Sequence, residues 1–108
     1  MDMFAEYIKE RENKSVYQTE HGFAVYQISG TECYIQDIFI KEQSRNKDNA
    51  REIADAVCEI AKSNGCKTLT GTVAPSLNGS TKSLGMLLHY GFKLHSCRED
   101  FIILVKEI

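Results

Sequence analysis

The sequence has little of what would mark a disordered, fibrous or strongly charged chain. A single proline and seven glycines among 108 residues exclude a disordered or collagen-like protein. The formal net charge of −2 gives no global attraction to nucleic acid or to an anionic membrane. We therefore expect a globular protein. Nucleic-acid binding would rest only on the local cluster Arg45, Lys47 and Arg51 and is a weak alternative.

Metal-site and membrane signals are also missing. The four cysteines lack C-x-x-C spacing, and Cys33, Cys58 and Cys66 fall on apolar faces of expected elements, where a reduced cysteine behaves as a small hydrophobe. No charged-then-apolar leader opens the chain, and no apolar run approaches the roughly 20 residues of a membrane span. We expect no metal, no membrane contact and a reducing, cytoplasmic environment.

The first half of the chain predicts one helix and an antiparallel meander. The length of the whole chain suits a single domain over residues 1–108. Phe4, Tyr7 and Ile8 have helical spacing within residues 2–11. Strand patterns follow at residues 14–19, 22–28 and 32–40, with turn signals between them.

A strand–helix–strand unit comes next. The strand ending at Ile40 leads through a polar connector, residues 41–47, to an amphipathic helix that begins near Asp48 and stops at Gly65. A second strand pattern covers residues 66–73. Such a unit is a right-handed βαβ, so we expect residues 33–40 and 66–73 to be adjacent parallel strands. The helix N-terminus then offers free N–H groups to an anion.

The C-terminal part predicts a helix and a hairpin. Residues 74–79 break the pattern, Ser80 or Thr81 can cap a helix, and Gly91 ends it. Leu84, Leu87 and Leu88 are its expected buried face. Strands follow at residues 92–96 and 101–105, the latter apolar enough to be buried on both faces. The expected fold is therefore α/β, with a mixed sheet.

Three segments resemble the GNAT superfamily of N-acetyltransferases, over roughly residues 22–105. In that family the pyrophosphate loop reads Arg/Gln-x-x-Gly-x-Gly/Ala before a long helix, and the last helix closes in a Gly-Phe pair. The matching segments read Asp37-Ile38-Phe39-Ile40-Lys41-Glu42, Arg45-Asn46-Lys47-Asp48-Asn49-Ala50 and Leu87-Leu88-His89-Tyr90-Gly91-Phe92. The resemblance implies the acyl-CoA N-acyltransferase fold, in a small member that moves an acetyl group from acetyl-CoA to an amine.

The resemblance also implies a cofactor site. Backbone groups of Phe39 and Ile40 would bond the pantetheine arm, where the two parallel strands splay apart. The pyrophosphate would lie on the loop, whose residues are Arg45, Asn46, Lys47, Asp48, Asn49 and Ala50.

Two departures from the family pattern concern the loop and the general acid. Asp48 stands where the family has its middle loop glycine, and its carboxylate would either oppose the pyrophosphate or simply cap the helix. Leu87 stands at the family's tyrosine. Of its neighbours, His89 is more often a solvated cap and Tyr90 a half-buried packing residue.

Asp37 is the candidate general base. It lies inside an apolar strand, where burial would make it a stronger base. The alternative is a structural acid paired with a nearby donor, and water could relay the proton instead.

Two functions are compatible with these residues. The first is an acetyl-CoA-dependent N-acetyltransferase acting on an amine of a protein or a small molecule. The second is a non-catalytic binding protein that keeps the fold. The front end is shorter than in the family, which suits a protein or peptide amine, and a homodimer would rebuild the missing wall.

Overall fold

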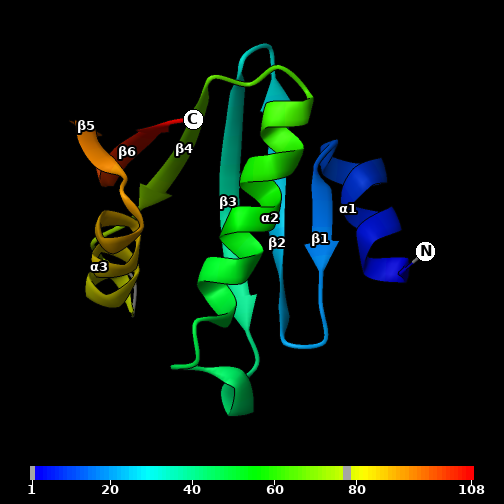
Figure 1. Ribbon diagram of the computed structural model, residues 1–108. Helices are drawn as coiled ribbons and strands as arrows, with labels where there is room; N and C mark the ends of the chain where they lie inside the picture. Colours follow the sequence, from blue (N-terminus) through cyan, green and yellow to red (C-terminus); the bar gives the residue numbers. More distant parts are fainter. Residues whose placement is uncertain (1, 77–78) are drawn as a thin grey trace.

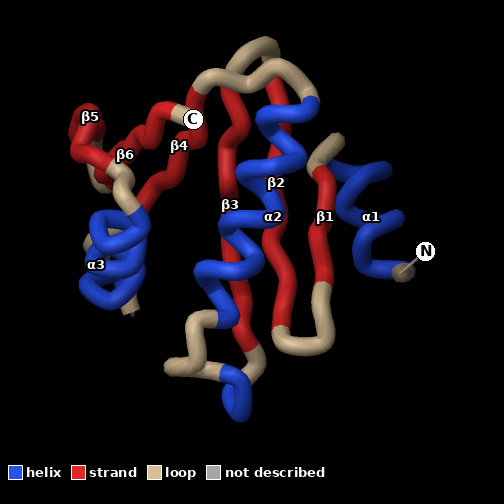
Figure 2. The backbone as a smooth tube through the Cα atoms, in the orientation of Figure 1, coloured by secondary structure: helices blue, strands red, loops and turns tan. Residues whose placement is uncertain are grey.

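The structure, a computed structural model, describes residues 2–76 and 79–108. Its elements form one six-stranded sheet in the order β1-β2-β3-β4-β6-β5, with three α-helices (Figures 1 and 2). The bounds are α1 Met3–Glu12, β1 Ser15–Gln18, β2 Gly22–Ser29, β3 Glu32–Ile40, η1 Glu42–Ser44, α2 Asn49–Ser63, β4 Thr68–Val73, α3 Ser80–Tyr90, β5 Lys93–Arg98 and β6 Phe101–Glu107.

The predicted meander and βαβ unit are confirmed. β1, β2 and β3 pair antiparallel in chain order, and β3 pairs parallel with β4 after the crossover through α2. β4 begins at Thr68, two residues later than the sequence pattern indicated, although Cys66 before it is buried. Gly65, at φ 82°, supplies the left-handed residue after α2. The C-terminal strands β5 and β6 form the expected hairpin.

The parallel pairing covers only part of β3. It runs from Glu32↔Thr68 to Ile35↔Gly71, whereas β3 continues to Ile40 paired with β2 alone. Figure 1 shows β4 turning away from β3 below this point. The second half of β3 therefore directs backbone groups into the gap that β4 leaves, instead of into a sheet ladder.

A β-bulge lies at the same place. Ile35 pairs with Tyr26 and Asp37 with Val25, so Gln36 is an extra residue on β3. Beyond it the alternation of faces is inverted: Ile38 joins Ile35 in the core, and Asp37 faces the other side.

The main core lies between the sheet and α2. Ile53, Val57 and Ala61 of α2 pack with Leu69 and Leu104 of the sheet. α1 covers the opposite face of the sheet near β1 and β2. The Phe4 ring of α1 contacts the Phe23 ring of β2, with ring centroids 5.2 Å apart. Phe23 points away from the core because its neighbour Ala24 points into it.

Three predictions about the C-terminal part were wrong. Gly79, in left-handed conformation at φ 81°, is the N-cap of α3 in place of Ser80 or Thr81. Leu88 is 49% exposed, because α3 rests on β4 through Leu87, next to Gly71. β6 is not buried on both faces: Leu104 is buried but Phe101 is 50% exposed. Residues 77 and 78, which belong to the segment predicted to interrupt the hydrophobic pattern, lie outside the described residues.

The start of β2 generates a prediction about stability. A Cβ on Gly22 would lie 2.0 Å from the Phe39 carbonyl oxygen and 2.9 Å from the Ile40 Cα. Because both are backbone atoms, Gly22→Ala should force the β2–β3 ladder apart and lower the free energy of unfolding by about 1–3 kcal/mol. Urea unfolding measures this change.

Gly85 provides the matched control. It lies inside α3, and a Cβ there meets nothing within 4 Å. Gly85→Ala should leave stability unchanged or raise it by up to about 1 kcal/mol. Equal midpoints for Gly22→Ala and the wild type would contradict the close approach at β2.

Candidate active site

A cleft of about 620 Å³ opens where β3 and β4 part. The end of β3, the β3–α2 loop (residues 41–48) and the first turns of α2 form one wall, and α3 forms the other. All the residues predicted to bind the cofactor line this cleft except Lys47. The Lys47 ammonium instead donates to the Gln43 carbonyl oxygen at 3.3 Å.

The β3–α2 loop holds two non-glycine residues in left-handed conformation. These are Asn46, at φ 64°, and Asp48, at φ 61°. Asn and Asp tolerate this region better than other side chains, but glycine occupies it without steric cost. The backbone at Asp48 therefore has the conformation that the family's glycine would favour.

Asp48 does not act as a side-chain cap. It occupies the N-cap position of α2, and its carbonyl accepts the first helical hydrogen bond from the Glu52 N–H at 3.1 Å. Asp48 is therefore the N-cap residue that the capping interpretation expected, but its exposed carboxylate makes no cap hydrogen bond. The N–H groups of the first turn of α2 have no intrahelical acceptor and carry partial positive charge toward the cleft.

Three positively charged side chains, those of Arg45, Arg51 and Lys82, line the cleft. The Arg45 Nε donates to the Ile40 carbonyl oxygen at 2.9 Å, and its guanidinium lies 5.8 Å from the centre of the Phe39 ring. Arg51 lines the cleft from α2 and Lys82 from α3. The sequence pattern indicated Arg45 and Arg51 as part of a basic cluster, but it gave no role to Lys82.

Sequence reasoning had weighed only His89 of four α3 residues that line the cleft, Lys82, Ser83, Met86 and His89. Their spacing of three to four residues is itself a helical stripe, so a signal was present. It was overlooked because the leucines of α3 were assigned the buried face first.

Tyr90 bridges the two helices that flank the cleft. Its hydroxyl donates a hydrogen bond to an Asp55 carboxylate oxygen of α2. Lys106 of β6 places its ammonium 3.8 Å from the centre of the Tyr90 ring and donates to the Tyr90 carbonyl oxygen at 3.0 Å. Tyr90 is half-buried, as predicted, and its proton is directed toward Asp55.

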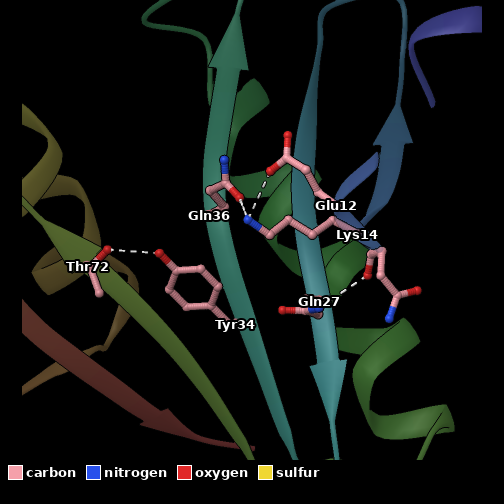
Figure 3. Close-up of polar contacts among 7 residues, drawn as sticks. Glu12, Lys14, Gln27, Tyr34, Gln36 and Thr72 are labelled. Atoms are coloured by element: carbon pink, nitrogen blue, oxygen red, sulfur yellow. Dashed lines mark hydrogen bonds and ion pairs between the residues drawn. The ribbon is translucent and has the colours of Figure 1, made fainter. Parts of the chain in front are cut away.

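Asp37 lies outside this cleft. The bulge at Gln36 turns it to the opposite face of the sheet, where it is exposed, so the burial expected for it was wrong. On the same face Tyr34 and Thr72 hydroxyls are 3.1 Å apart, joining β3 to β4 just where pairing ends (Figure 3). The Lys14 ammonium donates to the Gln36 side-chain oxygen and lies 3.2 Å from a Glu12 carboxylate oxygen (Figure 3).

Neither a cluster of metal-ligating side chains nor a helix that could span a membrane is found in the described part of the chain. No group of three or more His, Cys, Asp and Glu side chains there could hold a metal ion. No helix there is long and apolar enough to cross a membrane.

Comparison with known proteins identifies a family and several solved structures with a similar fold. A family profile described as the acetyltransferase (GNAT) family matches residues 7–92. A search of curated proteins found no match. The chain resembles the PaiA N-acetyltransferase of Thermoplasma acidophilum, solved in complex with coenzyme A, with a TM-score of 0.78 and 14% identity over 95% of this chain and 67% of that one.

Two further structures have comparable folds. An Elizabethkingia anophelis GNAT family acetyltransferase with acetyl-CoA bound has a TM-score of 0.74 and 20% identity, over 95% of this chain and 82% of that one. A Bacillus subtilis acetyltransferase in complex with CoA has a TM-score of 0.74 and 17% identity, over 95% and 83%. These likenesses confirm the predicted fold.

The Tyr90–Asp55 bridge generates a prediction about pH. Burial, and then the hydrogen bond to Asp55, raise the pKa of Tyr90 above its ordinary value of 10.0. The unfolded chain therefore loses this proton first, and the stability that Tyr90 contributes is lost as pH rises from about 10 upward. Tyr90→Phe should cost about 1 kcal/mol at pH 8 and should flatten the fall in stability above about pH 10.

Urea unfolding at a series of pH values tests this expectation. Tyr7→Phe, at a side chain in α1 that is 54% exposed, is the matched control and should leave the slope unchanged. Parallel pH profiles for Tyr90→Phe and the wild type would show that the bridge does not hold the Tyr90 proton.

Proposed function

Because a family match over residues 7–92 shows that the chain belongs to the acetyltransferase (GNAT) family, we propose that it transfers an acetyl group from acetyl-CoA to an amine. The observation that carries this proposal is the cleft at the parting of β3 and β4, with the α2 N-terminus at one end. A helix N-terminus receives phosphate, and unpaired strand backbone receives an amide-containing arm.

In this proposal the acetyl-CoA phosphates lie on the backbone of residues 46–50. Arg45 supplies charge from the loop, and Arg51 and Lys82, which line the same cleft, supply the rest. The pantetheine arm bonds the backbone of Phe39 and Ile40. A free N–H of this strand polarises the thioester carbonyl.

The acceptor amine approaches from the opposite face of the sheet. Its nitrogen attacks the thioester carbonyl carbon, the C–S bond breaks, and the amine proton passes to Asp37 or to water. Leu87 cannot protonate the departing thiolate, so solvent or His89, which lines the cleft, does so. The acceptor is an amine of a protein or a small molecule, and a second copy of the chain would wall its site.

No cysteine acyl intermediate takes part in this mechanism. Burial raises the pKa of the Cys33 thiol to about 12, so this cysteine stays protonated. Cys58 and Cys66 are also buried, and only Cys97 among the four is exposed. Free thiols of this kind suit the reducing cytoplasm that we assign to the protein.

Acetyl-CoA binding is the first test. At 100 times its dissociation constant the ligand should stabilise the fold by about 2.7 kcal/mol, measured as a rise in melting temperature and checked by calorimetric titration. Absence of heat and of a thermal shift at millimolar ligand would favour the alternative, a non-catalytic binding protein. The Asp48 carboxylate beside the proposed phosphate site is the observation that keeps this alternative open.

Variants of Asp48 separate charge from backbone strain. Asp48→Gly removes both and should tighten acetyl-CoA binding. Asp48→Asn removes the charge but keeps a side chain at φ 61°. Two unit charges at about 4 Å interact by roughly 1 kcal/mol in water and by more near a protein surface, so Asn should give about a tenfold gain if charge dominates. Unchanged binding by both variants would mean that the carboxylate faces away from the phosphates, and weaker binding by both would mean that the helix end needs Asp48.

Direct transfer predicts the behaviour of two further variants once an acceptor is found. Turnover should rise with pH as the acceptor amine deprotonates. Asp37→Asn should slow turnover by about 100-fold, the lower end of the range for a general base, because Asp37 is exposed. Cys97→Ser should leave turnover intact. An unchanged rate for Asp37→Asn would refute the base assignment, and loss of transfer in Cys97→Ser would refute the direct mechanism.

A further inference from the structure

His21 connects the turn between β1 and β2 to the loop that borders the cleft. Its Nδ1 lies 2.9 Å from the Ser44 Oγ, and its carbonyl oxygen accepts the Lys41 N–H at 2.9 Å. Its own N–H donates to the Thr19 Oγ1 at 3.1 Å. Both the backbone and the side chain of His21 are therefore engaged by polar groups, two of which belong to the β3–α2 segment.

Ser44 carries this connection to the helix. It is only 5% exposed, and a buried hydroxyl requires a hydrogen-bond partner, which His21 provides. The Ser44 carbonyl oxygen accepts a hydrogen bond from the Asn49 Nδ2 at 2.8 Å. Asn49 is the first residue of α2, so the chain of contacts His21–Ser44–Asn49 spans the base of the loop.

The loop needs such support because its backbone is strained. Asn46 and Asp48, both between Ser44 and Asn49, hold positive φ values without being glycine. Non-glycine residues in this region are strained and persist only when their surroundings fix them. Without the contacts at the base, the loop would sample other conformations, and the N–H groups at the α2 N-terminus would lose their alignment.

We infer that His21 is a positioning residue for the cofactor: through Ser44 it holds the β3–α2 loop in the conformation that receives the pyrophosphate of acetyl-CoA. This inference rests on the proposed function for its ligand, although not for the loop order itself. Glu20 adds little. Its carboxylate is 3.4 Å from the His21 Nε2, but its side chain is 84% exposed, and exposed ion pairs are weak.

Three variants at this position isolate the Nδ1 contact. His21→Ala removes it. His21→Asn places an amide group near the position of Nδ1, and His21→Gln places one near the position of Nε2, toward Glu20. If the competent loop conformation becomes rarer, the dissociation constant rises in proportion, so His21→Ala and His21→Gln should weaken coenzyme A binding by about tenfold. His21→Asn should remain within about threefold of the wild type.

Calorimetric titration with coenzyme A gives the dissociation constants. Where transfer is measured, the Michaelis constant for acetyl-CoA should rise in His21→Ala while kcat at saturation stays the same, which a general loss of folding would not produce. Equal affinity for His21→Ala and the wild type would overturn the inference and leave the proposed function standing. Equal weakening in His21→Asn and His21→Ala would also overturn it.

Amide hydrogen exchange of the free protein tests the loop without a ligand. His21→Ala should speed exchange in residues 42–49, while exchange in β3 and β4 stays the same and reports an intact fold. If the wild type does not bind coenzyme A but the variant still loosens the loop, the proposed function fails, and His21 keeps only its role in ordering the loop. Unchanged exchange in residues 42–49 would reject that role.

Discussion

The parting of β3 from β4 is the constraint on which the rest of the structure depends. Parallel pairing stops at Ile35↔Gly71, and the bulge at Gln36 comes at the next residue of β3. A sheet that continued would satisfy the backbone of Phe39 and Ile40 internally and leave no cleft. Because it stops, a cleft opens between α2 and α3, and the Tyr90–Asp55 hydrogen bond joins the two helices across it.

Sequence pattern predicted the order and type of the elements because each change of hydrophobic period marks a change of secondary structure. It could not predict the side on which Asp37 lies. Strict alternation from the buried Ile35 puts Asp37 in the core, and one extra residue in the bulge reverses that assignment. A bulge is specified by the twist of two strands together, so a single strand carries no sign of it.

The hydrophobic pattern also predicted more burial near the C-terminus than the structure has. Leu88 and Phe101 are apolar, yet each is about half exposed. A chain of 108 residues buries a smaller fraction of its surface than a larger protein does, so some apolar side chains stay exposed. The core is centred on the packing of α2 against the sheet, away from these two residues. The loop residues were found by resemblance, whereas His21 was not, because its contact with Ser44 joins residues 23 positions apart that share no motif.

In the proposed mechanism, the two departures from the family pattern act on different steps. Asp48 lies at the helix end and bears on how tightly phosphate is held. Leu87 bears on the departure of the thiolate, and it is fitted to its own surroundings: its methyl groups lie 3.4 and 3.5 Å from the position of a Gly71 Cβ, at the last residue pair before the strands part. The residue at the position of the family's tyrosine thus lines the cleft and lies between α3 and β4, so the absence of a tyrosine there and the presence of the cleft are compatible in one chain.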